Sequence, residues 1–263
     1  MSVPVLVTVV PSLSRVDGRR LLRHPAFLAG VALTVAGTVW FLAAAFDGGA
    51  TWEDDGWTTA VGAFMLGVLT MVATNMAALR DRREHTTEQH AALPVGPAPR
   101  IVGLLVATAW PAAATGVLLM IVAAIAASRG VGLTAAQVVL LVERVWSVVL
   151  LGAVGVALAV WIPRSFVVGL VAWAVLFLTP GETPRAWHAL LPFETFETGA
   201  TTIALWHLVY VVGLTGLVVA VALARAERRS RVLALAGASL AVAAGAAAVL
   251  LLHACPAGGP CWL

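Results

Sequence analysis

The chain contains no lysine and little charge of either sign. All sixteen of its basic residues are arginine, and only 11% of its 263 residues are charged. A soluble domain carries charge on about a quarter of its residues, so this chain has too little for a soluble fold. The absence of lysine also excludes an ordinary P-loop ATPase, which needs a lysine at the nucleotide phosphates. A retinal protein is excluded for the same reason, because its Schiff base forms on a lysine.

Apolar residues make up 61% of the chain, and its mean hydropathy is +0.97. They fall in blocks of about 20 residues, the length at which a helix crosses the ~30 Å hydrocarbon layer of a membrane. The polar stretches between the blocks are too short for a separate soluble domain. The sequence therefore predicts an all-α polytopic membrane protein.

We expect seven spanning helices, with the N-terminus in the cytoplasm and the C-terminus outside. The expected spans are residues 26–46, 58–79, 101–127, 138–162, 165–180, 203–224 and 231–253, between a cytoplasmic N-terminus (1–25) and an extracytoplasmic tail (254–263). This orientation places thirteen arginines inside and three outside, as the positive-inside rule requires. A re-entrant segment at Phe166–Thr179 would put the cluster Arg225–Arg231 outside, so the arginine distribution favours seven spans.

A basic segment, Ser12–His24, precedes the first span. Four arginines alternate in it with leucines and other residues: Arg15, Arg19, Arg20 and Arg23. This pattern favours a helix lying in the inner headgroup layer of the membrane. The alternative is a plain positive-inside anchor, which explains the arginines equally well.

The cytoplasmic loop Arg80–Arg100 reads RDRREHTTEQHAALPVGPAPR. Thr86 or Thr87 is suited to cap a short helix over Glu88–Leu93, which the following prolines end. A helix lying across the cytoplasmic face suits the docking of a partner protein. A plain connector is the alternative, although the loop is longer than a tight turn needs.

Two further segments lie outside the membrane on this topology. The stretch Pro180–Gly199 mixes apolar side chains with three glutamates, which favours short helices dipping into the outer leaflet over a plain external loop. The tail holds the only two cysteines, Cys255 and Cys261, on either side of Pro-Ala-Gly-Gly-Pro. In an oxidising space these two can pair as a disulfide, whereas two cysteines alone make a poor metal site.

Few ionisable residues lie within the expected spans. Glu143 and Arg144 are adjacent in the fourth span, and His207 lies near the outer end of the sixth. Ionisable residues are costly in lipid and mark solute pathways, so these three are the candidate pathway residues. Nothing ionisable lies deep in the first, third, fifth or seventh span, so we expect no proton relay. A membrane haem would need facing histidines, and we expect the chain to bind no cofactor or metal.

The order of these features resembles the permease subunit of an ABC transporter of the ABC-2 exporter class, as in high-GC actinobacteria. Three stretches carry the resemblance, and they are GRRLLRHPAFLAGVAL before and in the first span, the loop RDRREHTTEQHAALPVGPAPR, and ALWHLVYVVGLTGLVVAVALARAERRSR in and after the sixth span. The likeness covers residues 12–230 and lies in the order of segments, not in an invariant motif. The seventh span and the cysteine tail depart from the family's six-span core.

The resemblance implies that Ser12–His24 is an elbow helix and that Pro180–Gly199 holds external re-entrant helices. It implies that Glu84–Leu93 is a coupling helix, which sits in a groove of a separate ATPase subunit. The implied coupling residues are Glu84, His85, Thr86, Thr87, Glu88, His90 and Leu93. The working unit would be two ATPase chains and two permease chains, identical or homologous, in the bacterial plasma membrane. ATP and Mg would bind the partner, and this chain would have no catalytic site.

The main alternative is a membrane scaffold or sensor subunit of a larger complex, which shares the topology but needs no coupling helix. An intramembrane enzyme would need clustered His, Asp, Glu or Ser residues at membrane depth, and the expected spans show no such cluster. No nucleic-acid partner is expected, because the arginines lie in short loops at helix ends. The apolar spans do not identify a substrate.

Overall fold

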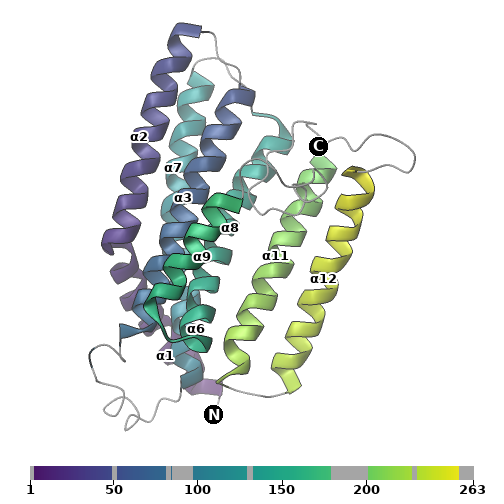
Figure 1. The fold of residues 1–263 in the computed structure, drawn as a ribbon. Helices are drawn as coiled ribbons and strands as arrows, with labels where there is room; N and C mark the ends of the chain where they lie inside the picture. Colours follow the sequence, from purple (N-terminus) through teal and green to yellow (C-terminus); the bar gives the residue numbers. More distant parts are fainter. Residues whose placement is uncertain are drawn as a thin grey trace.

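The computed structural model is all-helical wherever it describes the chain, over residues 3–48, 52–80, 84, 97–128, 133–178, 201–226 and 230–254. No strand occurs within those residues. The helices are α1 (Val3–Leu22), α2 (Pro25–Gly48), α3 (Trp52–Ala78), α6 (Pro97–Ala107), α7 (Ala109–Ser128), α8 (Ala135–Trp161), α9 (Ser165–Leu178), α11 (Thr201–Ala224) and α12 (Ser230–Ala254). Figure 1 shows them as one elongated bundle.

Three helices, α3, α8 and α11, form the central row of this bundle. All three run in the same direction, toward the end at which the N-terminus lies (Figure 1). The pairs α3–α8 and α8–α11 have two of the most extensive interfaces in the structure. The helices α2 and α9 pack on α3, α7 packs on α8, and α12 packs on α11. Residues on α8 therefore lie at the centre of the molecule.

Glycines let the backbones of α3 and α8 approach closely. A Cβ atom at Gly155 would lie 2.2 Å from the carbonyl oxygen of Met71, so only glycine fits there. Two buried hydrogen bonds cross the same interface. Thr74 Oγ1 donates to the Gly152 carbonyl oxygen at 2.9 Å, and Asn75 Nδ2 donates to the Gly155 carbonyl oxygen at 3.1 Å. Helices in lipid lack a hydrophobic drive to associate, so close packing and such hydrogen bonds hold them together.

The helix α12, which contains the seventh expected span, packs on α11 by the same means. A Cβ atom at Gly213 would lie 2.8 Å from the backbone nitrogen of Ala243, and one at Gly216 would lie 2.4 Å from Ser239 Oγ. Small residues on both helices thus face each other across the interface. The helix is an integral part of the bundle.

Local sequence signals account for where several helices begin and break. Thr134 caps α8, because its Oγ1 accepts from the Gln137 backbone while the Gln137 side chain accepts from the Thr134 backbone. The long helix of the third expected span is interrupted at Thr108, since Pro111 has no N–H to donate to the Ala107 carbonyl. Pro25 begins α2, a position where proline costs no hydrogen bond. The helices α1 and α2 are bent by 55° relative to each other.

The bundle has the surface of a membrane protein. Large apolar side chains are exposed on its outer faces, among them Leu33, Val117, Met120, Leu170, Leu233 and Leu252. Within the described residues, four helices are long and apolar enough to cross a membrane: Ala98–Ser128, Ala135–Trp161, Thr201–Ala224 and Ser230–Leu252. The bent pair Val9–Leu22 and Pro25–Val39 adds a fifth if it counts as one span. The chain is therefore an all-helical, multi-pass membrane protein, as the sequence predicted.

The expected spans each coincide with helical structure, and the third corresponds to α6 and α7 together. The helix α9 is described over 14 residues, fewer than the about 20 apolar residues that cross a membrane. The helix α3 has 27 residues, and the apolar segment found among its described side chains is Gly62–Ala78. The helical class is confirmed, whereas the number of seven spans and the direction of insertion stay predictions.

Replacing Gly155 with alanine tests the contact between α3 and α8. The added methyl group would force the two backbones apart, so we expect Gly155→Ala to lower the free energy of unfolding by about 1–3 kcal/mol. Gly237→Ala on α12 is the matched control, because no atom lies within 4 Å of a Cβ atom there. The control should be neutral or slightly stabilising. Unfolding of the purified chain in a detergent–denaturant titration measures both, and equal stability of the two variants would contradict the predicted close contact.

Candidate functional site

Two of the three candidate pathway residues, Glu143 and His207, meet at the interface of α8 and α11. His207 Nδ1 lies 3.1 Å from Glu143 Oε2, and the two side chains are 0% and 1% exposed. Arg144 follows Glu143 on α8 and is also buried. The fold thus brings together two residues that are 64 positions apart in the sequence.

The parallel course of α8 and α11 explains this meeting. Glu143 lies eight residues after the first residue of α8, and His207 lies six residues after the first residue of α11. Helices rise 1.5 Å per residue, so the two side chains sit at nearly the same depth. The depth of each residue could be predicted from the sequence, whereas the neighbourhood of these two helices could not.

A carboxyl group and an imidazole therefore share one buried site, and the next residue of α8, Arg144, is buried as well. Removing one member of such a set is costly, because it leaves a buried polar or charged group without compensation. Tyr210, almost one turn beyond His207 on α11, has its ring centroid 6.0 Å from the imidazole. The arrangement keeps buried polar groups of α8 and α11 close together at a fixed place between the two helices.

Further polar links continue along the same interface toward the end where the N-terminus lies. Trp146 Nε1 donates to Thr215 Oγ1 at 3.1 Å, and Trp161 Nε1 donates to the Val221 carbonyl oxygen at 2.8 Å. The guanidinium of Arg225 lies 5.4 Å from the centroid of the Trp161 ring, a cation–π contact. We call this line of contacts from Glu143 to Arg225 the α8–α11 seam. The sequence alone did not reveal these hydrogen bonds of Trp146 and Trp161.

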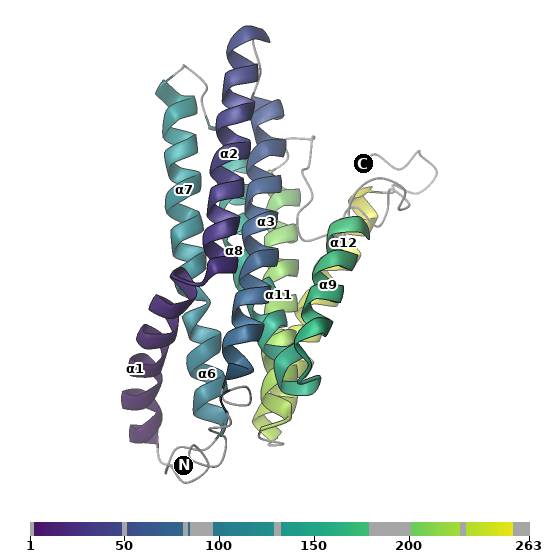
Figure 2. The same ribbon diagram turned by 60° about the vertical axis from the view of Figure 1, so that its left-hand side comes forward.

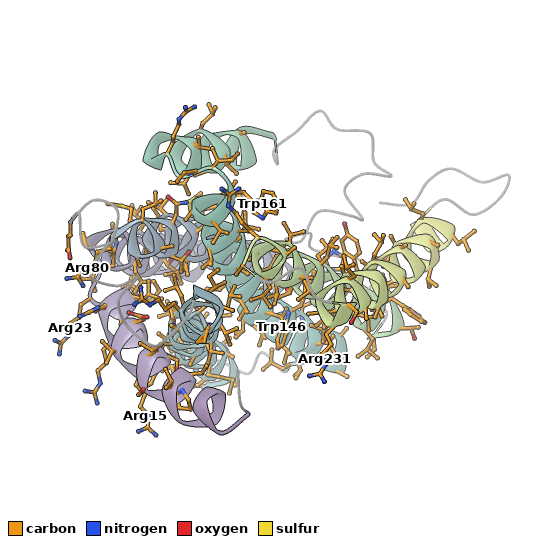
Figure 3. All side chains as sticks on the ribbon, turned by 90° about the horizontal axis from the view of Figure 1, so that it is seen from below. Arg15, Arg23, Arg80, Trp146, Trp161 and Arg231 are labelled. Carbon is orange, nitrogen blue, oxygen red and sulfur yellow. The ribbon has the colours of Figure 1, made fainter. Side chains whose placement is uncertain are left out.

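Arginines gather where the seam ends. Nine of the ten arginines in the described residues belong to segments that meet at this end of the bundle, and Arg144 is the tenth. They are Arg15, Arg19, Arg20, Arg23, Arg80, Arg100, Arg164, Arg225 and Arg231. Figure 3 views the bundle from this end, which we call the arginine end, and shows Arg15, Arg23 and Arg80 on the flank formed by α1 and α3.

The four arginines expected on an elbow helix lie on α1 or directly after it. The helix begins at Val3, earlier than the expected Ser12, and it packs along α6 and the start of α7 (Figure 2). Its Gly18 lies so close to the ring of Trp110 that a Cβ atom there would be 2.1 Å from it. The helix α1 is therefore a packed part of the bundle, which the sequence reading did not anticipate.

Of the expected coupling residues, the structure describes Glu84. Its backbone N–H donates to the Arg80 carbonyl oxygen at 2.9 Å. Its Oε1 accepts from Arg80 Nε at 2.6 Å. The remaining coupling residues lie outside the described residues, as do Pro180–Gly199 and both cysteines: His85, Thr86, Thr87, Glu88, His90, Leu93, Cys255 and Cys261.

Comparison with protein-family models, with curated proteins and with solved structures finds no match for this chain. Within the described residues, no three His, Cys, Asp or Glu side chains gather as they would around a metal ion. The candidate site is thus defined by its own geometry, which comprises the buried Glu143–His207 pair, the seam and the arginine end.

Substitution of His207 tests whether the buried pair is an energetic contact. His207→Leu removes the imidazole nitrogen that lies 3.1 Å from Glu143 Oε2, so we expect the free energy of unfolding to fall by about 1–3 kcal/mol. His207→Gln keeps a side-chain donor of similar reach and should lose clearly less. A denaturant titration of the purified chain in detergent compares the two. An equal loss in both variants would mean that the shape of the imidazole matters and its polar contact does not.

Proposed function

We propose that this chain is the membrane-spanning permease subunit of an ATP-driven ABC exporter in a bacterial plasma membrane. Seven helices cross the membrane, with the N-terminus in the cytoplasm and the C-terminus outside. ATP and Mg bind a separate ATPase subunit, and two ATPase chains work with two permease chains. The second permease chain is a copy of this one or a homologue.

The observation that supports this proposal most strongly is the position of α1 beside the C-terminal end of α3. Arg20 of α1 and Arg80 after α3 both line two adjoining cavities. Arg100, in the first turn of α6, lines one of these two cavities. The two segments that the family resemblance assigns to the ATPase side therefore lie next to each other, although α2 and α3 separate them in the chain. A partner docked on the loop Arg80–Arg100 would also meet α1.

The distribution of arginines supports the proposed orientation. Nine of the ten described arginines lie at the arginine end, and the described residues at the opposite end carry none. Arginine-rich ends of membrane proteins stay in the cytoplasm. The arginine end would thus face the cytoplasm, where ATP is present. This fits a chain whose lysine-free sequence contains no phosphate-binding loop and which would need a separate ATPase subunit.

The central row provides a route for mechanical coupling in this proposal. A push on the loop after α3 acts on a helix whose backbone touches α8 at Gly155. The helix α8 in turn packs along α11 at the seam. Glu143 and His207 are fully buried in this conformation, so they line a pathway only when α8 and α11 move apart. ATP-driven movement of α3 and α8 relative to α11 would supply that opening.

A scaffold or sensor subunit is the alternative function. It shares the multi-pass fold and the arginine end, but its partner need not hydrolyse ATP. The two functions differ in whether the loop after α3 controls an ATPase.

Charge reversal in the loop tests the coupling role. In complexes purified through a tag on this chain, Glu88→Arg should lower ATP hydrolysis at least about tenfold if the loss of docking costs 1.4 kcal/mol or more. Glu53→Arg is the matched control, because it makes the same charge change in the first turn of α3, at the opposite end of that helix. Unchanged hydrolysis in intact Glu88→Arg complexes would count against a coupling helix.

The absence of lysine makes the orientation directly measurable. An engineered lysine is the only side-chain amine in the chain, so a membrane-impermeant amine reagent labels it only from its own side. In intact cells we expect Ser128→Lys, at the end of α7, to be labelled and Glu88→Lys to be protected. Permeabilised cells should label both. Labelling of Glu88→Lys in intact cells would reverse the proposed topology.

A further inference from the structure

Two adjoining cavities open at the arginine end between α1, α3, α6 and α8. Their volumes are about 340 and 320 Å³, and both are lined by Arg20, Ala77 and Arg80. We call them together the arginine cavity. Each is of the size at which small-molecule sites begin, about 300 Å³, so the space can hold a polar group of several atoms.

The polar wall of the cavity has a net positive charge. Arg20, Arg80 and Arg100 come from three different segments, whereas Asp17 and Glu84 are the acidic lining residues. His24 also lines it, and partial burial lowers the pKa of its imidazole, so this side chain is neutral at pH 7. Among the described lining residues, three cations against two anions leave one positive charge.

The ion pairs within the cavity are exposed enough for a bound anion to replace the carboxylate partner of each arginine. Arg20 Nη1 lies 3.7 Å from Asp17 Oδ1, and Arg80 Nε lies 2.6 Å from Glu84 Oε1. The side chains of Arg20 and Arg80 are 57% and 45% exposed. Exposed pairs of this kind contribute little to stability, about 0–1 kcal/mol. A multivalent anion can therefore bind both guanidinium groups without a large loss of protein stability.

The remaining wall of the cavity is apolar. It is formed by side chains such as Ala77, Leu104, Val156 and Val160, from α3, α6 and α8. A freely soluble anion gains nothing from such a surface, whereas an amphiphile does. Arginine is also costly within the hydrocarbon, so the cavity lies at the level of the lipid headgroups.

From this combination we infer that the arginine cavity binds the phosphate headgroup of an anionic phospholipid. The guanidinium groups of Arg20 and Arg80 hold the phosphate oxygens, and the start of an acyl chain lies along the apolar wall. Basic pockets between membrane helices are suited to such headgroups. A bound lipid would join α1 to α3 and α6 at the face from which the loop Arg80–Arg100 leaves. This inference does not depend on the proposed transport function.

Native mass spectrometry of the full chain, titrated with phosphatidylglycerol or phosphatidylcholine of equal acyl length, tests it. Each arginine near the membrane surface contributes about fivefold to anionic lipid affinity, so Arg20→Gln/Arg80→Gln should lower phosphatidylglycerol binding at least about tenfold. Arg164→Gln/Arg231→Gln is the control, because it removes the same charge at the same end, outside the cavity lining. The control should change binding less than about twofold.

A variant that binds more phosphatidylglycerol than the wild-type chain would show that changes in binding do not come from misfolding. Glu84 competes for Arg80, so Glu84→Gln should raise phosphatidylglycerol binding several-fold while leaving phosphatidylcholine binding unchanged. Equal binding of the two lipids by the wild-type chain, or an equal loss in both double variants, would overturn the proposed site. Displacement of the lipid by inorganic phosphate alone would reassign the cavity to a soluble phosphate group and overturn the lipid.

Discussion

The backbones of α3 and α8 touch at Gly155, and the order of the other helices follows from that contact. Lipid offers no hydrophobic reward for bringing two apolar helices together, so the close approach and the hydrogen bonds from Thr74 and Asn75 must supply the attraction. With α8 held against α3 on one side, its other side is left for α11. The buried Glu143–His207 pair lies on that second interface.

The charged residues are distributed unevenly between the two ends of the bundle. One end gathers nine of the ten described arginines, together with α1 and the start of the loop after α3. Toward the other end, the buried Glu143 and His207 compensate each other between parallel helices. The seam connects the two regions through Trp146 and Trp161. A signal or force applied at the arginine end would therefore reach the buried pair through contacts between rigid helices.

The sequence predicted where the helices lie along the chain better than which helices pack side by side. Blocks of apolar residues located each helix, and the Thr134–Gln137 capping box marks the start of α8 three residues before the expected span. Pro111 was a signal for the break at Thr108, but the uninterrupted hydropathy hid it. The Glu143–His207 contact and the arginine cavity depend on which helices lie side by side. Periodicity within one chain contains little information on that order, because most of the helices are apolar on most of their surface.

We propose that this chain works as the membrane-spanning subunit of an ATP-driven transporter. The most direct test is to purify the tagged chain from its native host in mild detergent and to identify its partners by mass spectrometry. The account predicts a P-loop ATPase in near-equal amount, which is lost when residues Glu84–Leu93 are replaced. Recovery of the chain without any ATPase, under conditions that keep known ABC complexes together, would contradict the account and favour the scaffold or sensor function.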